Sequence, residues 1–397
     1  MRVAVLKETL SGEKRVAIVP ESVNRLVAKK IDVSVQAGAG EASMASDDEY
    51  KSFGATVEAS LDALLASADL AIKIRIPTLD EIAKLKEGCT LVSLLLPLVN
   101  HELVRALALR KVTAIAVDMI PRTTVAQMMD VLSSQATAAG YQAVLAAATH
   151  LPKFFPMLMT AAGTIAPARV LVLGAGVAGL QAIGTARRLG AVVEAFDVRK
   201  VVKEQVESLG AKFVEVEPVS GESSDSNQTA GGYAKETSDE YKKKQSEAIA
   251  RHVAKADICI ATALIPGRRA PILITAEMVK SMKPGSVIVD LAAEQHGNCE
   301  LTESGKTIVR HGVTIIGETN FPSKMPLHAS QMYSRNMEKF LFHLVKDGAM
   351  KVDLADVITA GSVITLGGEV VHAKVKEALA ALGGGSTSSA STSGPQS

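Results

Sequence analysis

A glycine-rich turn in the middle of the chain carries the clearest chemical signal. The turn Gly174-Ala175-Gly176-Val177-Ala178-Gly179 follows the β-rich run 170–173 and opens a segment with helical spacing. In that context the first glycine permits a tight turn, the second lets the backbone approach a pyrophosphate, and the third allows close helix–sheet packing. The helix start adds free N–H donors and a positive dipole end. The turn therefore predicts a dinucleotide site and hydride-transfer chemistry.

An acidic residue stands where such a site needs one. Asp197 closes the next β-rich run, 18 residues beyond Gly179, where a carboxylate accepts hydrogen bonds from the adenosine ribose. Because the same carboxylate repels a 2′-phosphate, the pattern favours NAD(H) over NADP(H). The cations Arg199 and Lys200 qualify this preference, since neighbouring cations sometimes hold a 2′-phosphate.

Size and composition exclude several classes of protein. At 397 residues, with 47% apolar and 21% charged residues, the chain has material for about two globular domains. A formal charge of +1 gives no field that would draw it to nucleic acid. The three cysteines are odd in number and widely spaced, which favours a reduced, cytoplasmic setting over a disulfide framework. No signal peptide or membrane span is expected. Glu294, His296 and Cys299 have irregular spacing, so no metal site is expected either.

Strand-like and helix-like segments alternate in two series. The first has helical patterns at 20–30, 46–54, 78–86 and 100–110 between the β-rich runs. Such alternation predicts an α/β fold with doubly wound, mostly parallel sheets. The expected strands are 3–6, 32–35, 70–74, 90–95 and 114–117 in the first series, then 170–173, 191–196, 257–260, 286–289 and 313–316 in the second.

Two long helical stretches, 130–148 and 330–345, separate the series and predict crossings between two domains. We expect two Rossmann-like domains joined by these helices, with a cleft between them. Residues 1–136 and 321–382 would form the first, discontinuous domain, and residues 137–320 the NAD-binding domain. The polar segment 215–244 would be a mobile loop, and the Gly/Ser/Thr-rich segment 383–397 a flexible tail.

The first domain opens with motifs that resemble a known pair of families. Val5-Leu6-Lys7-Glu8, followed by Glu13-Lys14-Arg15-Val16-Ala17-Ile18-Val19-Pro20, is similar to both alanine dehydrogenases and the NAD(H)-binding component of proton-translocating transhydrogenase. Three later runs resemble the transhydrogenases specifically, and with them the likeness spans residues 1–382. These runs are the nicotinamide loop at 121–135, the mobile loop at 231–236, and Thr262-Ala263-Leu264-Ile265-Pro266-Gly267.

The resemblance implies roles for particular residues. Arg122, Gln127, Asp130 and Ser133 would hold the nicotinamide, its carboxamide and its ribose, and Tyr233 would close over the nucleotide. Of these, Arg122, Gln127 and Asp130 are expected to act in catalysis. The full expected cofactor-binding set is Arg122, Gln127, Asp130, Ser133, Gly174, Ala175, Gly176, Val177, Ala178, Gly179, Asp197, Val198, Arg199, Tyr233, Ala263 and Leu264.

The alanine dehydrogenase alternative lacks its proton-transfer group. Where that family carries a catalytic histidine, this chain reads Leu94-Leu95-Leu96-Pro97-Leu98. Its lysine and aspartate correspond to Arg75 and Glu294 here. Hydride exchange between two nicotinamides needs no such acid, because no carbonyl or amine gains or loses a proton.

The resemblance therefore implies the NAD(H)-binding component of a proton-translocating NAD(P) transhydrogenase, passing hydride between NADH and NADP⁺. NADP(H) would be bound by a partner subunit. A homodimer is expected, with an NADP(H)-binding subunit and a membrane-spanning proton-channel subunit as partners, and no nucleic acid. The chain would be cytoplasmic and peripheral on the inner face of the cell membrane. Two alternatives remain open: a soluble NAD-dependent alanine or amino-acid dehydrogenase, and an NAD-sensing module without chemistry.

Overall fold

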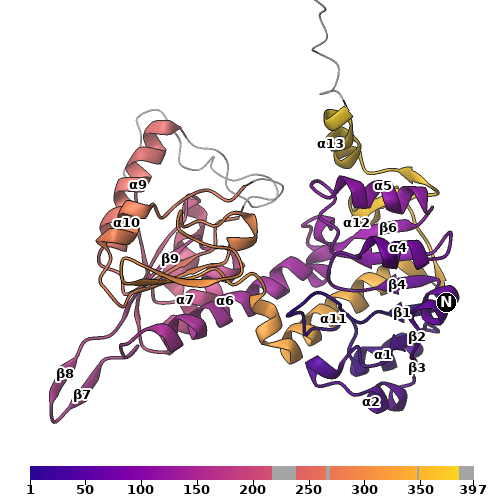
Figure 1. The fold of residues 1–397 in the computed structure, drawn as a ribbon, viewed down its shortest axis with the longest axis horizontal. Helices are drawn as coiled ribbons and strands as arrows, with labels where there is room; N and C mark the ends of the chain where they lie inside the picture. The colour runs from indigo at the N-terminus through magenta and orange to yellow at the C-terminus, as the bar shows by residue number, and fades with distance from the viewer. Residues whose placement is uncertain (217–237, 265–268, 347, 384–397) are drawn as a thin grey trace, which may run out of the picture. The chain divides into compact units, whose positions relative to one another are not determined.

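The computed structural model describes residues 1–216, 238–264, 269–346 and 348–383 (Figure 1). The chain divides into two compact units. Unit 1 comprises Met1–Ser11, Arg15–Val131 and Tyr333–Ser397, and unit 2 comprises Gly12–Lys14 and Leu132–Met332. Each unit has its own sheet and its own hydrophobic core, as expected for an α/β protein of two Rossmann-like parts.

The sheet of unit 1 has eight strands in the order β19-β18-β6-β5-β4-β1-β2-β3. Strands β1 to β6 are parallel, whereas β18 and β19 are antiparallel additions at one edge. The winding reverses between β1 and β4, which is the point where doubly wound sheets bind ligands. The strands are β1 (Arg2–Val5), β2 (Asp32–Gln36), β3 (Thr56–Glu58), β4 (Leu70–Ile72), β5 (Thr90–Ser93), β6 (Thr113–Ala116), β18 (Val363–Leu366) and β19 (Glu369–Val370).

Local sequence explains where the helices of unit 1 begin. Pro20 occupies the first turn of its helix, Ser46 and Ser60 accept backbone hydrogen bonds as N-caps, and Thr78 forms a capping box with Glu81. The four expected helices are confirmed with shorter bounds, and α3 was not expected. The helices are α1 (Pro20–Val27), α2 (Asp47–Ser52), α3 (Leu61–Ser67), α4 (Leu79–Lys84), α5 (His101–Leu109), α12 (Val357–Ser362) and α13 (Ala373–Gly383).

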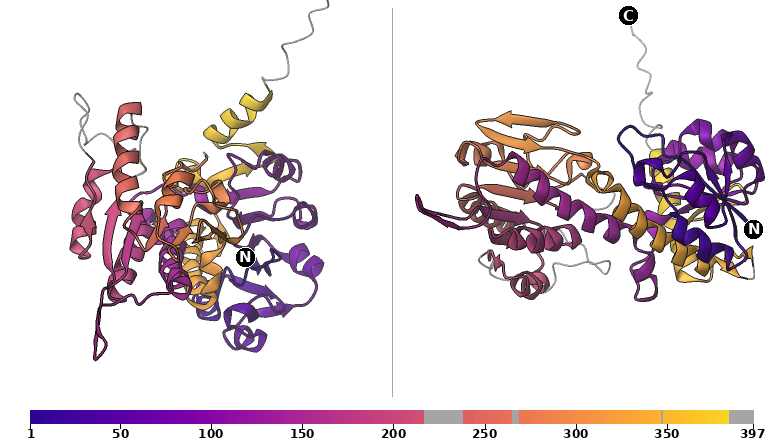
Figure 2. Two further views of the ribbon diagram at one scale, coloured as in Figure 1. Left: turned by 60° about the vertical axis from the view of Figure 1, so that its left-hand side comes forward. Right: turned by 90° about the horizontal axis from the view of Figure 1, so that it is seen from below.

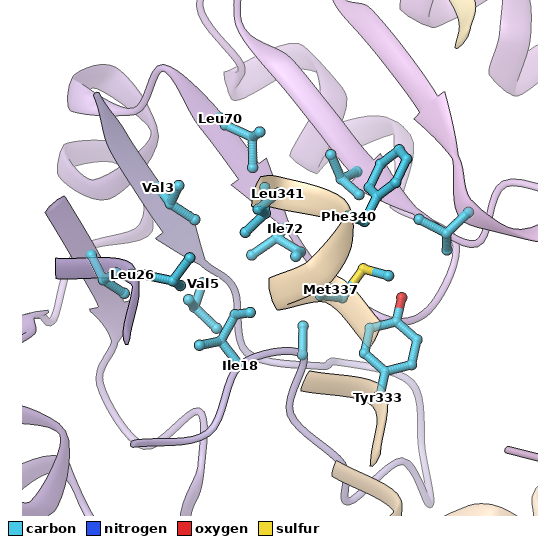
Figure 3. Close-up of a cluster of buried hydrophobic side chains, with 14 of the residues drawn as sticks. Val3, Val5, Ile18, Leu26, Leu70, Ile72, Tyr333, Met337, Phe340 and Leu341 are labelled. Carbon is cyan, nitrogen blue, oxygen red and sulfur yellow. The ribbon is translucent and has the colours of Figure 1, made fainter. Parts of the chain in front are cut away.

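Both faces of this sheet are buried, which is why its strands are almost wholly apolar. Val3 and Val5 face one cluster, and the alternate residue Ala4 faces another. Figure 3 shows the first cluster, where Met337 and Phe340 of the helix α11 (Pro326–Leu344) lie among side chains of the sheet. The C-terminal part of α11 thus completes the core of unit 1.

The sheet of unit 2 repeats the same winding in the order β11-β10-β9-β12-β13-β15-β14, with only β14 antiparallel. The first reversal lies between β9 and β12, directly beside the glycine-rich turn. Its elements are β9 (Arg169–Leu173), α7 (Val177–Arg188), β10 (Val192–Phe196), α8 (Lys203–Ser208), β11 (Lys212–Phe213), α9 (Asp239–Val253), β12 (Ile258–Ala261), α10 (Ala276–Ser281), β13 (Val287–Asp290), β14 (Thr307–Arg310) and β15 (Val313–Ile316).

The structure corrects several expected boundaries. The long helices are α6 (Val131–His150) and α11, which begins four residues earlier than expected at Pro326. The expected loop 215–244 was drawn too long, because Ser238 caps α9 and residues 239–244 are helical. Residues 217–237 and 384–397 lie outside the described part of the chain, and Gly383 ends α13 rather than beginning a tail.

A two-stranded hairpin of unit 2 was not expected. Strands β7 (Leu158–Thr160) and β8 (Gly163–Ile165) pair only with each other among the described strands, and the hairpin projects from the rest of unit 2 (Figure 2). A second small ribbon in unit 1 joins β16 (Val345–Lys346) to β17 (Ala349–Met350). Within the described residues, no helix is both long enough and apolar enough to cross a membrane.

Candidate nucleotide-binding site

The glycine-rich turn has the geometry of a phosphate cradle. Gly174 has a φ of +100°, and a Cβ atom there would stand 2.6 Å from Thr262 Oγ1. The Thr262 hydroxyl instead donates a 2.9 Å hydrogen bond to the Gly174 carbonyl, so the turn is fixed to the end of β12. Only glycine satisfies both the dihedral angle and the close approach.

The other two glycines of the turn have different surroundings. A Cβ at Gly179 would lie 1.9 Å from the Gly174 carbonyl oxygen, so α7 packs directly on the turn. A Cβ at Gly176 would meet nothing nearer than Arg199 Nη2 at 4.0 Å. That open face adjoins the N-terminus of α7, where unpaired N–H groups favour an anion. The residues present therefore fit a dinucleotide pyrophosphate.

A further glycine supports this arrangement from behind. At Gly140, within α6, a Cβ would lie 2.1 Å from the Ala178 carbonyl oxygen, so α6 contacts the first turn of α7 inside unit 2. The sequence reasoning did not single out Gly140. An isolated glycine inside an otherwise helical, alanine-rich pattern was the available signal.

Asp197 is nearly buried and fully engaged. Its carboxylate accepts the Ala175 N–H at 2.8 Å and the Arg199 backbone N–H at 2.9 Å, and it pairs with the Arg199 guanidinium at 2.7 and 2.9 Å. The hydrogen bond from Asp197 raises the pKa of Arg199. The carboxylate thus ties the turn to the end of β10, and Arg199 lies beside Gly176 as a counterion.

The end of β12 contributes Ala263 and Leu264. The Ala263 N–H donates to Asn298 Oδ1, and Asn298 Nδ2 donates back to the Ala263 carbonyl, both at 2.9 Å. Asn298 is itself held by the buried carboxylate of Asp290 at 2.8 Å. No sequence signal identified Asn298, because its partner is distant along the chain. Leu264 is 41% exposed beside this network.

In unit 1, the predicted nicotinamide loop follows β6. Arg122 Nε lies 3.8 Å from Asp130 Oδ2, so the structure brings these two residues together. Gln127 is exposed on the short helix Val125–Met129, whose Met128 carbonyl accepts Asn336 Nδ2 at 2.8 Å. Asn336 anchors the loop from α11 and was missed by sequence reasoning.

The remaining expected residues lie elsewhere. Ser133 is in the first turn of α6 and groups with unit 2, whereas Arg122, Gln127 and Asp130 belong to unit 1. Val198 is half-buried against the core of unit 2. Tyr233 lies outside the described residues.

Neither metal nor thiol chemistry is indicated in the described part of the chain. It contains no group of three or more His, Cys, Asp or Glu side chains placed to hold a metal ion. Cys89, Cys259 and Cys299 are buried, and burial raises the pKa of Cys89 and of Cys299 to about 11. A buried thiol that stays protonated is a poor nucleophile.

These features define an α/β protein with a Rossmann-type dinucleotide-binding unit. Comparison with known proteins places it further. Residues 4–139 match the family described as "Alanine dehydrogenase/PNT, N-terminal domain", and residues 143–373 match "Alanine dehydrogenase/PNT, C-terminal domain". The chain is 49% identical over 379 residues to an NAD(P) transhydrogenase alpha subunit of Rhodospirillum rubrum, covering 94% of this chain and 98% of that protein.

Solved structures and a second group of relatives agree. A transhydrogenase structure from Sinorhizobium meliloti is 43% identical with a TM-score of 0.82, covering 94% of this chain and 99% of that one. An L-alanine dehydrogenase structure is 27% identical with a TM-score of 0.80, covering 96% and 100%. The alanine dehydrogenase of Halomonas elongata is 32% identical over 96% of this chain and 97% of that protein.

The chain belongs to the alanine dehydrogenase/PNT family, within which it groups with the NAD(P) transhydrogenase alpha subunits. It is accordingly an oxidoreductase component of the transhydrogenase type, and family membership supports the expected binding of NAD(H).

The contrast between two glycines of α7 gives a direct test of the turn. In Gly179→Ala the new methyl group would collide with the Gly174 carbonyl, so NADH binding should weaken roughly a hundredfold, or about 2.7 kcal/mol. Gly184→Ala is the matched control, since its Cβ would make an ordinary 3.7 Å contact with Arg188. It should leave binding unchanged and stabilise the helix by about 0.5–1 kcal/mol. Fluorescence titration with NADH and thermal unfolding measure both effects; equal binding by the two variants would contradict the assignment.

Proposed function

We propose that this chain holds NADH on unit 2 and gives its hydride to NADP⁺ bound by a partner subunit. The observation that carries the proposal is the combination of a complete dinucleotide turn with the lack of an imidazole in residues 94–98, where the related dehydrogenases have their proton-transfer group. A chain built this way binds the cofactor and lacks that means of protonating a small carbonyl substrate.

Each part of the site has a proposed role toward the bound nucleotide. The α7 N-terminus and residues 174–179 bind the pyrophosphate, and Asp197, Val198 and Arg199 receive the adenosine ribose. Ala263 and Leu264 contact the nucleotide from the end of β12. Because all the contacts found at Asp197 are with protein donors, ribose binding would require the Arg199 side chain to share or leave that carboxylate.

The loop of unit 1 is the proposed nicotinamide-binding segment. Arg122 and Asp130 fix its ends through their ion pair, and the exposed Gln127 would reach the carboxamide. Ser133 and Tyr233 complete the proposed set. When bound, the dihydronicotinamide supplies the hydride, and the protein's contribution is to hold the donor at about 3–3.5 Å from its acceptor in a dry environment.

The proposed partners are a subunit that binds NADP(H) and a membrane-spanning subunit that carries the proton channel. Proton translocation would then belong to the assembled complex, with this chain peripheral on the inner face of the cell membrane. Support comes from the grouping with transhydrogenase alpha subunits.

An assay with two donors separates this function from that of an amino-acid dehydrogenase. The chain, mixed with NADH and a partner NADP(H)-binding subunit, should reduce NADP⁺, and the chain alone should not reduce NAD⁺ with L-alanine. Chromatographic separation of NADPH from NADH follows the first reaction, and absorbance at the dihydronicotinamide band follows the second. Turnover of alanine without a partner would overturn the proposal, and binding of NADH without turnover in either mixture would favour a sensing module.

Gln127 provides a residue-level prediction. Gln127→Ala should change the NADH dissociation constant by no more than about twofold and slow hydride transfer by roughly tenfold or more, because it removes a positioning contact. Thr124→Ala, on the same loop and with no side-chain cap hydrogen bond, is the control and should transfer hydride at the normal rate. Rapid-quench measurement on the complex distinguishes them, and an unchanged rate in Gln127→Ala would remove this residue from the site.

We also propose a homodimer formed through the β7–β8 hairpin. Met159 is 80% exposed and Ile165 38% exposed, and residues 154–168 contain no charged side chain. An isolated two-stranded ribbon is marginal in water, and uncharged edges usually pair. An identical uncharged edge is a suitable partner, because it brings no charge repulsion.

Charge placed on the hairpin should therefore separate the subunits. Met159→Lys is expected to raise the dimer dissociation constant by roughly tenfold or more, about 1.4 kcal/mol, as measured by sedimentation equilibrium. Val309→Lys, at an exposed position of the antiparallel strand β14, is the control and should leave association unchanged. A monomeric wild-type chain, or a Met159→Lys variant that dimerises normally, would overturn this assignment.

A further inference from the structure

Leu96 is held in a backbone conformation that leucine rarely adopts. It follows β5 with a φ of +46°, in the left-handed region, and its side chain is 45% exposed. A branched apolar residue at positive φ is an outlier that persists only where its surroundings impose it, and such outliers concentrate at functional sites. Solvent exposure makes the position more unusual, since the side chain has no core to fill.

The surrounding hydrogen bonds show what imposes this conformation. Asp118 accepts the Leu95 N–H at 2.9 Å and the Leu96 N–H at 3.1 Å on its two carboxylate oxygens. The Leu96 carbonyl accepts the N–H groups of Val99 and Asn100 at 3.1 Å. The backbone of Leu96 is thus fixed on both sides by hydrogen bonds that do not involve its side chain.

Asp118 connects this strained position to the loop of unit 1. Strands β5 and β6 are parallel neighbours, with Ser93 opposite Ala116, so the residues after each strand emerge at the same edge of the sheet. Asp118 lies in the short helix Val117–Met119, directly before the chain enters the Arg122–Asp130 segment. One carboxylate therefore holds together the chain segments that follow the two strands.

We propose that Leu96 is a positioning residue for hydride transfer, forming an apolar wall that keeps water from the nicotinamide, with Asp118 holding it in place. The proposal rests on the proposed function and adds residues to its site. It explains why an apolar side chain is kept exposed at a strained position: exclusion of water is needed where a hydride moves, and an apolar surface provides it.

Leu96→Asn separates the side chain from the backbone, because asparagine tolerates the left-handed region and is polar. We expect it to slow hydride transfer in the complex by roughly tenfold, with the NADH dissociation constant within about twofold of normal. Lys30→Asn is the matched control, since Lys30 is exposed, has a φ of +62° and directly precedes the start of β2, at the opposite ends of the strands. It should leave the rate unchanged.

A spectroscopic measurement makes the test independent of the partner. Acrylamide should quench the fluorescence of NADH bound to Leu96→Asn more strongly than that of NADH bound to the wild type or to Lys30→Asn. Asp118→Asn, which leaves one N–H facing an amide NH₂, should act in the same direction. Asp69→Asn is its control, because Asp69 accepts the Arg2 N–H at the opposite ends of the strands of the same sheet.

Equal rates and equal quenching in Leu96→Asn and Lys30→Asn would overturn the inference. So would a large loss of NADH affinity in Leu96→Asn, which would make Leu96 a general binding contact. The proposed function fails in a different way, namely if the wild-type chain with its partner transfers no hydride, and the quenching comparison on the chain alone can still be read in that case.

Discussion

The close packing of helix α7 on the glycine-rich turn is the constraint on which the site depends. The space between Gly179 and the Gly174 carbonyl is too small for a methyl group, and so is the space between Gly140 and the Ala178 carbonyl. These contacts bring the N-terminus of α7 to the end of β9, where its free N–H groups face the open side of Gly176. Every property that makes unit 2 a nucleotide-binding unit follows from this approach.

The two units share one winding and differ at the place where it reverses. In unit 2 the reversal carries the glycine turn and Asp197, which engages the Ala175 N–H and Arg199. In unit 1 the chain after β1 lacks the glycine spacing, and the Glu8 carboxylate accepts the N–H groups of Ile74 and Arg75 at the end of β4. A carboxylate of the protein thus satisfies backbone donors near the corresponding position, so the same fold serves a different purpose.

Sequence reasoning reached the fold class and the turn because both rest on local patterns. Alternating apolar runs and capping residues mark the elements, and the spacing of Gly174, Gly176 and Gly179 marks the site. It missed the hairpin, whose residues 154–168 look like an apolar linker, and it missed Asn298 and Asn336, whose partners are distant in sequence. The Arg199–Asp197 pairing was also hidden, since sequence does not reveal which direction a cation takes.

The central claim is that the hydride passes directly from NADH held by this chain to NADP⁺ held by its partner. Mass spectrometry of the NADPH formed from NADH that carries deuterium at both C4 positions of its nicotinamide, in ordinary water, tests this most directly. The account predicts one deuterium per NADPH in the complex and none released to the solvent. Unlabelled NADPH, or label found in water or in an amino acid, would contradict it.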